Sequence, residues 1–92
     1  MNVFTKGTFN RDVASLSDVV LLETLQEKIK ELITAPNISH VTGVKLLKGY
    51  QTHYRIKVIT ERSSFRIGAV IRGNTVWLVR FLPRRKIYLH FP

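Results

Sequence analysis

The side chains best suited to chemistry in this sequence are lysines, arginines and a tyrosine in its second half. They are Lys45, Lys48, Arg55, Lys57, Arg66, Arg80, Arg84, Arg85, Lys86 and Tyr88. Lysine and arginine bind the phosphates of a nucleic acid, and a neighbouring aromatic ring can stack on its bases. There is no cysteine, and the three histidines lie far apart in the sequence. We therefore expect no metal site and no cofactor.

The positive charge is confined to this second half. The 92 residues carry a formal net charge of +9. Residues 1–44 contain four basic and five acidic residues, a net of −1, whereas residues 45–92 contain eleven basic residues and one acid, a net of +10. Such an excess points to a polyanionic partner: a nucleic acid, an acidic protein segment or an anionic membrane surface.

Two observations argue against a membrane protein. No apolar run approaches the roughly 18 residues that a membrane-spanning helix needs, and the first residues lack the apolar centre of a signal peptide. The lack of cysteine fits a reducing compartment. We predict a cytoplasmic location.

The first half has the apolar periodicity of two helices. Phe9, Val13 and Leu16 form one stripe at helical spacing. Ser17 is a candidate cap for a second helix, which Pro36 ends. One face of that helix would carry Leu22, Leu25, Ile29, Leu32 and Ile33. These features predict a helical hairpin from about Lys6 to Ala35, after a short strand at Asn2–Phe4.

The second half alternates like strands. The three predicted strands are 54–59, 65–71 and 75–82, with a loop at 60–64 and a two-residue turn at Gly73-Asn74. Amphipathic helices and a one-sided sheet bury their apolar faces against each other. We predict a single α+β domain over residues 1–92, in which two helices pack on an antiparallel sheet of three long strands.

Strand parity divides the sheet residues between two faces. The residues expected to face the helices are Tyr54, Ile56, Val58, Phe65, Ile67, Ala69, Trp77, Val79 and Phe81. The residues expected on the other face are Arg55, Lys57, Arg66, Gly68, Val76, Leu78, Arg80 and Leu82. This division predicts a basic sheet face, with Lys45 and Lys48 beside it and Arg84 to Tyr88 following the last strand.

Four short motifs in this order resemble the RelE/ParE superfamily of type II toxin–antitoxin toxins. They are K-L-x-K-G from Lys45 to Gly49, Y-R-I-K from Tyr54 to Lys57, F-R-I from Phe65 to Ile67, and R-R-K-I-Y from Arg84 to Tyr88. The resemblance implies two N-terminal helices packed on an antiparallel sheet. The chain also departs from relatives: Arg55 stands where many have a second lysine, and Pro83 where many have a histidine. The C-terminal helix of some relatives is expected to be missing.

The resemblance implies a metal-independent endoribonuclease in which a 2′-hydroxyl attacks the adjacent phosphate. Lys57 is then the candidate base, because surrounding cations favour its neutral form. Arg66 and Arg84 would hold the scissile phosphate, and Tyr88 would stack on a base or orient the nucleophile. The remaining cations would bind RNA: Lys45, Lys48, Arg55, Arg80, Arg85 and Lys86.

Three functions remain open on the sequence. The first is a RelE-like mRNA interferase that cuts mRNA in the ribosomal A site and inhibits translation. The second is a ParE-like toxin that inhibits DNA gyrase by binding, and the third is a non-catalytic member. The family also implies a cognate antitoxin, and the charge of +9 favours an acidic segment in that partner and a hetero-oligomer.

Overall fold

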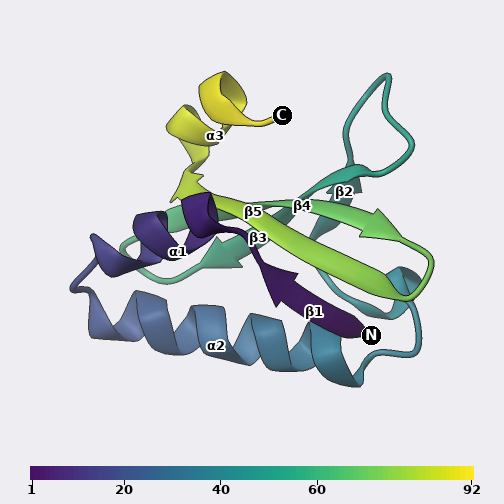
Figure 1. Ribbon diagram of the computed structural model, residues 1–92. Helices are drawn as coiled ribbons and strands as arrows, with labels where there is room; N and C mark the ends of the chain where they lie inside the picture. The colour runs from purple at the N-terminus through teal and green to yellow at the C-terminus, as the bar shows by residue number, and fades with distance from the viewer.

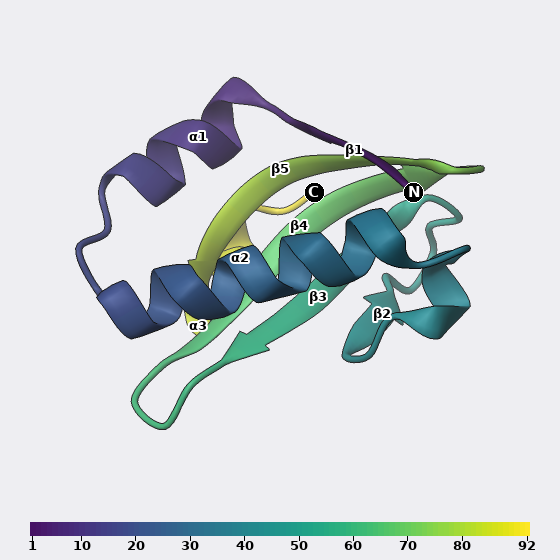
Figure 2. The same ribbon diagram turned by 90° about the horizontal axis from the view of Figure 1, so that it is seen from below.

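A long helix lies across one face of a five-stranded sheet, and a short C-terminal helix lies on the other face (Figures 1 and 2). This computed structural model describes residues 1–92. The elements are β1 (Asn2–Thr5), α1 (Gly7–Ala14), α2 (Val19–Thr34), the 3-10 helix η1 (Ile38–His40), β2 (Val44–Leu46), β3 (His53–Ile59), β4 (Ser64–Arg72), β5 (Thr75–Pro83) and α3 (Arg84–His90). The predicted α+β class is confirmed.

The sheet has the strand order β1-β5-β4-β3-β2. The three predicted strands form its centre as the antiparallel meander β3-β4-β5. The predicted N-terminal strand is present as β1, but it pairs with β5 in parallel, so the sheet is mixed. Strand β2, which pairs antiparallel with β3 at the other edge, was not predicted.

The helical hairpin is present, with local differences from the prediction. Asp18, not Ser17, caps α2: its carboxylate accepts a hydrogen bond from the backbone N–H of Leu21 at 3.1 Å. Leu21, Leu25 and Leu32 are buried against the sheet, whereas Ile33 is 52% exposed. No helix in the structure has both the length and the apolar character needed to cross a membrane.

The main core lies between α1, α2 and the sheet. It contains Ile56, Val58, Ile67, Ala69 and Phe81, all of which strand parity assigned to this face. The parity prediction was wrong elsewhere in β5. Val76 and Leu78 are fully buried in this core, while Trp77 is only half-buried and lies on the opposite face.

A β-bulge explains this error. Gly68 pairs with Arg80, but the next residue Ala69 pairs with Leu78, so Val79 is an extra residue in β5. A bulge reverses the side-chain parity beyond it. Val79 therefore joins the opposite face, although the parity of the sequence assigned it to the main core.

The second face of the sheet has a small core of its own. Leu47, Ile87 and Phe91 form a buried cluster, against which Val79 and Leu82 pack. This cluster anchors α3, so the prediction that a C-terminal helix is missing was wrong. The face of the sheet on which α3 lies is called the α3 face below.

Candidate functional site

A small cavity on the α3 face collects most of the predicted site residues. It has a volume of about 200 Å³ and is lined by Gly43, Lys45, Arg55, Lys57, Arg66, Arg84 and Tyr88. We call it the cationic pocket. Strand pairing builds it, because Lys45 lies opposite Arg55 and Lys57 lies opposite Arg66. Helix α3 adds Arg84 and Tyr88 at i and i+4, which places both on one side of the helix.

Arg66 is the buried cation of the pocket, with only 7% of the residue exposed. Its Nη1 donates hydrogen bonds to Ser64 Oγ at 3.1 Å and to the Phe65 carbonyl at 3.0 Å. Burial, followed by the charges of Arg84 and Arg55, lowers the pKa of Arg66. A guanidinium stays charged in a protein. Arg66 is therefore a fixed positive charge whose other nitrogens remain free for an anion.

Tyr88 lies among three guanidinium groups. The Arg55 guanidinium carbon is 4.3 Å from the centre of its ring, and Arg84 Nε donates to its hydroxyl oxygen at 3.3 Å. The hydrogen bond from Arg84, together with the charges of Arg84, Arg55 and Arg66, lowers the pKa of the Tyr88 phenol. Tyr88 remains 47% exposed, so it is available to a ligand.

Arg55 has an unsatisfied donor in this pocket. Its Nε is buried and makes no hydrogen bond. Buried N–H groups are nearly always paired, and an unpaired one calls for an explanation. Arg55 lines the cationic pocket. Because this nitrogen is closed to solvent, an anion in the pocket would reach it only after the Arg55 side chain moved.

The position of Lys57 depends on the turn before β2. The backbone N–H of Lys57 donates to the Gly43 carbonyl at 2.9 Å. Gly43 has a φ of +72°, and a Cβ there would lie 3.2 Å from the Lys57 Cβ. Glu31 on α2 fixes the preceding residue, because its carboxylate accepts from the Thr42 N–H at 2.9 Å. These contacts leave the Lys57 side chain exposed at the pocket.

The predicted RNA-binding residues do not all lie at the cationic pocket. Lys45 and Arg55 line the cationic pocket, and Lys48 lines an adjoining cavity of about 100 Å³ together with both of them. Arg85 and Lys86 are exposed on α3 and line no cavity.

Arg80 is the exception, because it does not reach the pocket. Its Nε and Nη2 donate to the Asp12 carboxylate at 2.8 and 3.2 Å. Asp12 lies on α1, so this pair joins α1 to β5. The prediction that Arg80 contributes a free cation to the basic face was wrong. The bulge beside Arg80 redirects its side chain toward α1.

Sequence reasoning missed Gly43 as part of the site. A glycine shortly before a cationic strand was a detectable signal, since a positive φ commonly requires glycine. Sequence reasoning also missed Leu47, Ile87 and Phe91, which hold α3 in place. These apolar residues are too widely spaced to predict a common cluster from periodicity.

The cationic pocket has the composition of a phosphate site. Its lining includes five Lys or Arg residues, one tyrosine and no acid. The lysines and the tyrosine can exchange a proton, whereas the arginines act as fixed charges. The structure brings no three His, Cys, Asp or Glu side chains together in a way that would hold a metal ion.

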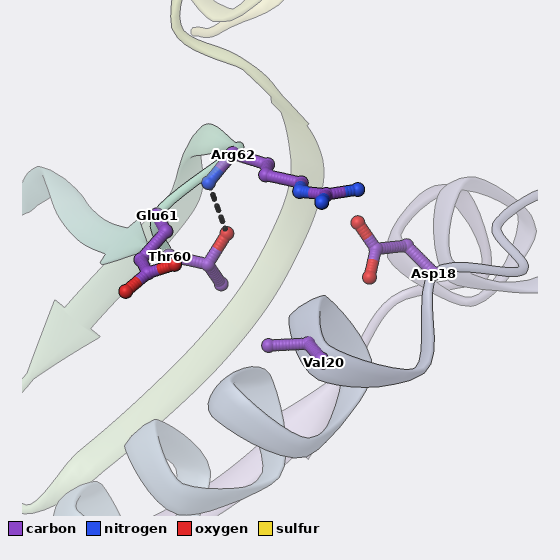
Figure 3. A pocket seen from close by; sticks show the side chains of 5 residues that line it. All are labelled: Asp18, Val20, Thr60, Glu61 and Arg62. Atoms are coloured by element: carbon purple, nitrogen blue, oxygen red, sulfur yellow. Dashed lines mark hydrogen bonds between the residues drawn. The ribbon is translucent and has the colours of Figure 1, made fainter.

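A larger cavity of about 460 Å³ lies on another part of the molecule (Figure 3). It is lined by Asp18, Val20, Thr60, Glu61 and Arg62, where α2 begins and β3 connects to β4. Asp18 already caps α2, and Thr60 Oγ1 accepts from the Arg62 N–H at 3.3 Å. Asp18 and Thr60 are thus already engaged by local backbone groups, and the cavity holds one cation against the five of the cationic pocket.

Comparison with solved structures shows which known proteins the fold resembles. The fold matches the crystal structure of the RelB–RelE antitoxin–toxin complex from Methanococcus jannaschii with a TM-score of 0.74 and 26% sequence identity. The match covers 97% of this chain and 99% of the other. A metal-bound toxin from Helicobacter pylori matches with a TM-score of 0.56 at 18% identity, over 95% of this chain and 98% of that one. This second likeness concerns the fold alone.

Sequence comparison adds a local match. Over 49 residues the chain is 41% identical to toxin RelE3 of Methanocaldococcus jannaschii, which is 53% of this chain and 51% of that toxin. The chain thus spans about half the length of this relative. No protein-family model matches the chain. The fold and the two RelE matches support a RelE-family toxin, as the four motifs imply.

Proposed function

We propose that the chain is the toxin of a type II toxin–antitoxin system and a ribosome-dependent endoribonuclease that cuts mRNA in the A site and thereby inhibits translation. The observation that carries the proposal is the cationic pocket, which combines three arginines with Lys57 and Tyr88. The RelE matches support the same class of toxin.

The proposed reaction is attack of a 2′-hydroxyl on the adjacent phosphate. Lys57 accepts the proton of the hydroxyl, the new 2′-oxygen–phosphorus bond forms, and a 2′,3′-cyclic phosphate results. Arg66 and Arg84 stabilise the negative charge that develops on the phosphate, which is commonly the largest contribution to catalysis.

The bond from phosphorus to the 5′-oxygen breaks in the same reaction, and this oxygen needs a proton as it leaves. Tyr88 is the proposed donor, because its lowered pKa makes the phenol a stronger acid than an ordinary tyrosine. The chain needs no further co-reactant for this cleavage.

The proposed partner is an antitoxin that covers the α3 face. The RelE relative was solved in complex with RelB, and eleven of the fifteen basic residues here lie in residues 45–92. An acidic antitoxin segment would match that charge. The expected assembly is a hetero-oligomer of toxin and antitoxin.

Induction of the chain without an antitoxin tests the proposal. Mapping of transcript 5′ ends should show cleavage with codon spacing in translated regions only. Lys57→Ala and Arg66→Ala should each reduce the cleavage rate on purified programmed ribosomes about 100-fold or more. Lys30→Ala removes an equal charge from exposed α2 and should leave the rate unchanged.

The same experiment separates the alternatives. Accumulated DNA breaks with intact mRNA would contradict the proposal and indicate a gyrase inhibitor. Intact DNA, intact mRNA and normal growth would indicate a member without toxic activity.

A further inference from the structure

A second group of side chains lies on the α3 face, away from the cationic pocket. Phe4 on β1 pairs with Trp77 on β5, and Trp77 pairs with Val70 on β4. Their strand neighbours Val3 and Val76 pack in the main core. Because successive residues of a strand point to opposite faces, Phe4, Trp77 and Val70 lie on the α3 face.

Phe4 and Trp77 form an aromatic platform. Their ring centres are 6.4 Å apart and their planes differ by 28°. Phe4 is 55% exposed and Trp77 is half-buried. Exposed aromatic rings on a sheet are a common surface on which unpaired bases stack.

Two cations flank this platform. A cavity of about 320 Å³ is lined by Lys6, Val70, Arg72 and Trp77. Lys6 and Arg72 are exposed, and neither takes part in an ion pair. Aromatic rings next to unpaired cations suit a nucleotide, whose base stacks while its phosphate meets the positive charge.

The acidic residues are all accounted for elsewhere. Asp12 binds Arg80, Asp18 caps α2, Glu23, Glu27 and Glu31 lie on α2, and Glu61 lies in the loop between β3 and β4. None lines the cationic pocket or the cavity at the platform. The positive charge of the α3 face is therefore not neutralised within the chain.

The platform and the cationic pocket are close enough for one strand. Arg66 and Val70 lie four residues apart on β4, which is about 14 Å at ~3.4 Å per residue. Phe91 packs over Gly68 between these two positions, so an RNA strand that joins them passes over the C-terminal end of α3. Phosphates of one strand in a duplex are spaced about 3.4 Å along the axis. At that spacing, about four nucleotides span this separation.

We propose that Phe4 and Trp77 stack on bases of the single-stranded RNA whose phosphate occupies the cationic pocket, with Lys6 and Arg72 binding phosphates a few nucleotides away. This inference rests on the proposed ribonuclease function, because it takes RNA as the ligand. It adds a second binding subsite to that function.

Trp77 reports on the proposal directly, because it is the only tryptophan. Uncleavable 2′-O-methyl RNA of about eight nucleotides should quench its fluorescence in a saturable way. Phe4→Ala, and a Lys6→Ala/Arg72→Ala double variant, should each weaken affinity about tenfold. Arg66→Ala should also weaken binding of the long RNA. The matched control Lys30→Ala/Arg62→Ala removes two charges from outside the α3 face and should bind like the parent chain.

Labelled RNA followed by anisotropy gives a second measurement. Binding seen by anisotropy without any change in Trp77 fluorescence would contradict stacking on the platform and leave the proposed function standing.

A short RNA of about three nucleotides tests whether one strand occupies both subsites. Equal quenching by this RNA, insensitive to Arg66→Ala, would show a separate RNA site and contradict the proposal that a single strand reaches both. Competition by polyglutamate with the same change in Trp77 emission would identify a surface for acidic protein. Absence of RNA binding in both measurements, and of cleavage on ribosomes, would refute both proposals.

Discussion

The chemistry of Tyr88 depends on its neighbours. Its phenol ordinarily titrates near pH 10, and the Arg84 hydrogen bond and surrounding guanidinium charges lower that pKa. Stacking against Arg55 requires only the ring, whereas donating a proton requires the hydroxyl. The two roles can therefore be separated by substitution.

We expect Tyr88→Phe to keep the contact with Arg55 but to reduce cleavage on ribosomes about 100-fold, because the proton donor is removed. Tyr88→Ala should additionally weaken RNA binding. In a spectrophotometric titration, one of the three tyrosines should ionise early, and Tyr88→Phe should remove that transition. Arg84→Met should move it to higher pH, because the phenolate loses its donor and a nearby charge, whereas Arg85→Met should not. Full activity of Tyr88→Phe would contradict the proton-donor role.

At this scale, the chemistry of the site was more predictable than its geometry. Alternation on β3 and β4 correctly separated Arg55, Lys57 and Arg66 from the main core. It failed for Arg80, because a bulge depends on how two strands and α1 fit together. Nothing in the periodicity of β5 marks that extra residue.

Among the elements, the long ones were predictable, whereas two short ones, β2 and α3, were not. Helix α2 and strands β3, β4 and β5 have enough residues for their periodicity to be read. Strand β2 has three residues and α3 has seven. Helices this short are unstable alone. Their formation depends on tertiary contacts, such as the cluster of Leu47, Ile87 and Phe91.

Asp12 is the main polar connection between α1 and β5. Besides Arg80, its carboxylate accepts the backbone N–H of Phe81 at 2.9 Å. The Asp12 side chain is 13% exposed and that of Arg80 is 25% exposed. Asp12→Ala leaves a partly buried guanidinium and a backbone N–H without their acceptor.

We expect Asp12→Ala to lower the free energy of unfolding by about 2–3 kcal/mol, as measured by urea denaturation. Arg80→Ala should have a smaller effect, because Phe81 keeps its acceptor. A double-mutant cycle gives the coupling between the two side chains. A coupling energy near zero would show that the ion pair contributes nothing to the attachment of α1.

At the scale of the whole molecule, the charge asymmetry of the sequence becomes an asymmetry of faces. Helices α2 and α3 lie on opposite faces of the sheet (Figures 1 and 2). Three of the six acids belong to α2, whereas Arg84 and Tyr88 of α3 line the cationic pocket. A net charge of +9 would attract any polyanion from all directions. The arrangement of charge instead predicts that only the cations of the α3 face bind RNA phosphates.

The salt dependence of RNA binding distinguishes these two possibilities. For single strands, the slope of log K against log salt concentration changes by about 0.7 for each phosphate that the protein no longer neutralises. Arg66→Ala should therefore reduce the slope by about that amount, whereas Lys30→Ala on α2 should leave it unchanged. Both variants carry one charge fewer, so general attraction by net charge predicts equal effects. Titration of an uncleavable RNA at several salt concentrations gives both slopes. Equal slopes for the two variants would mean that net charge governs binding, and the α3 face would then have no special role in contacting RNA.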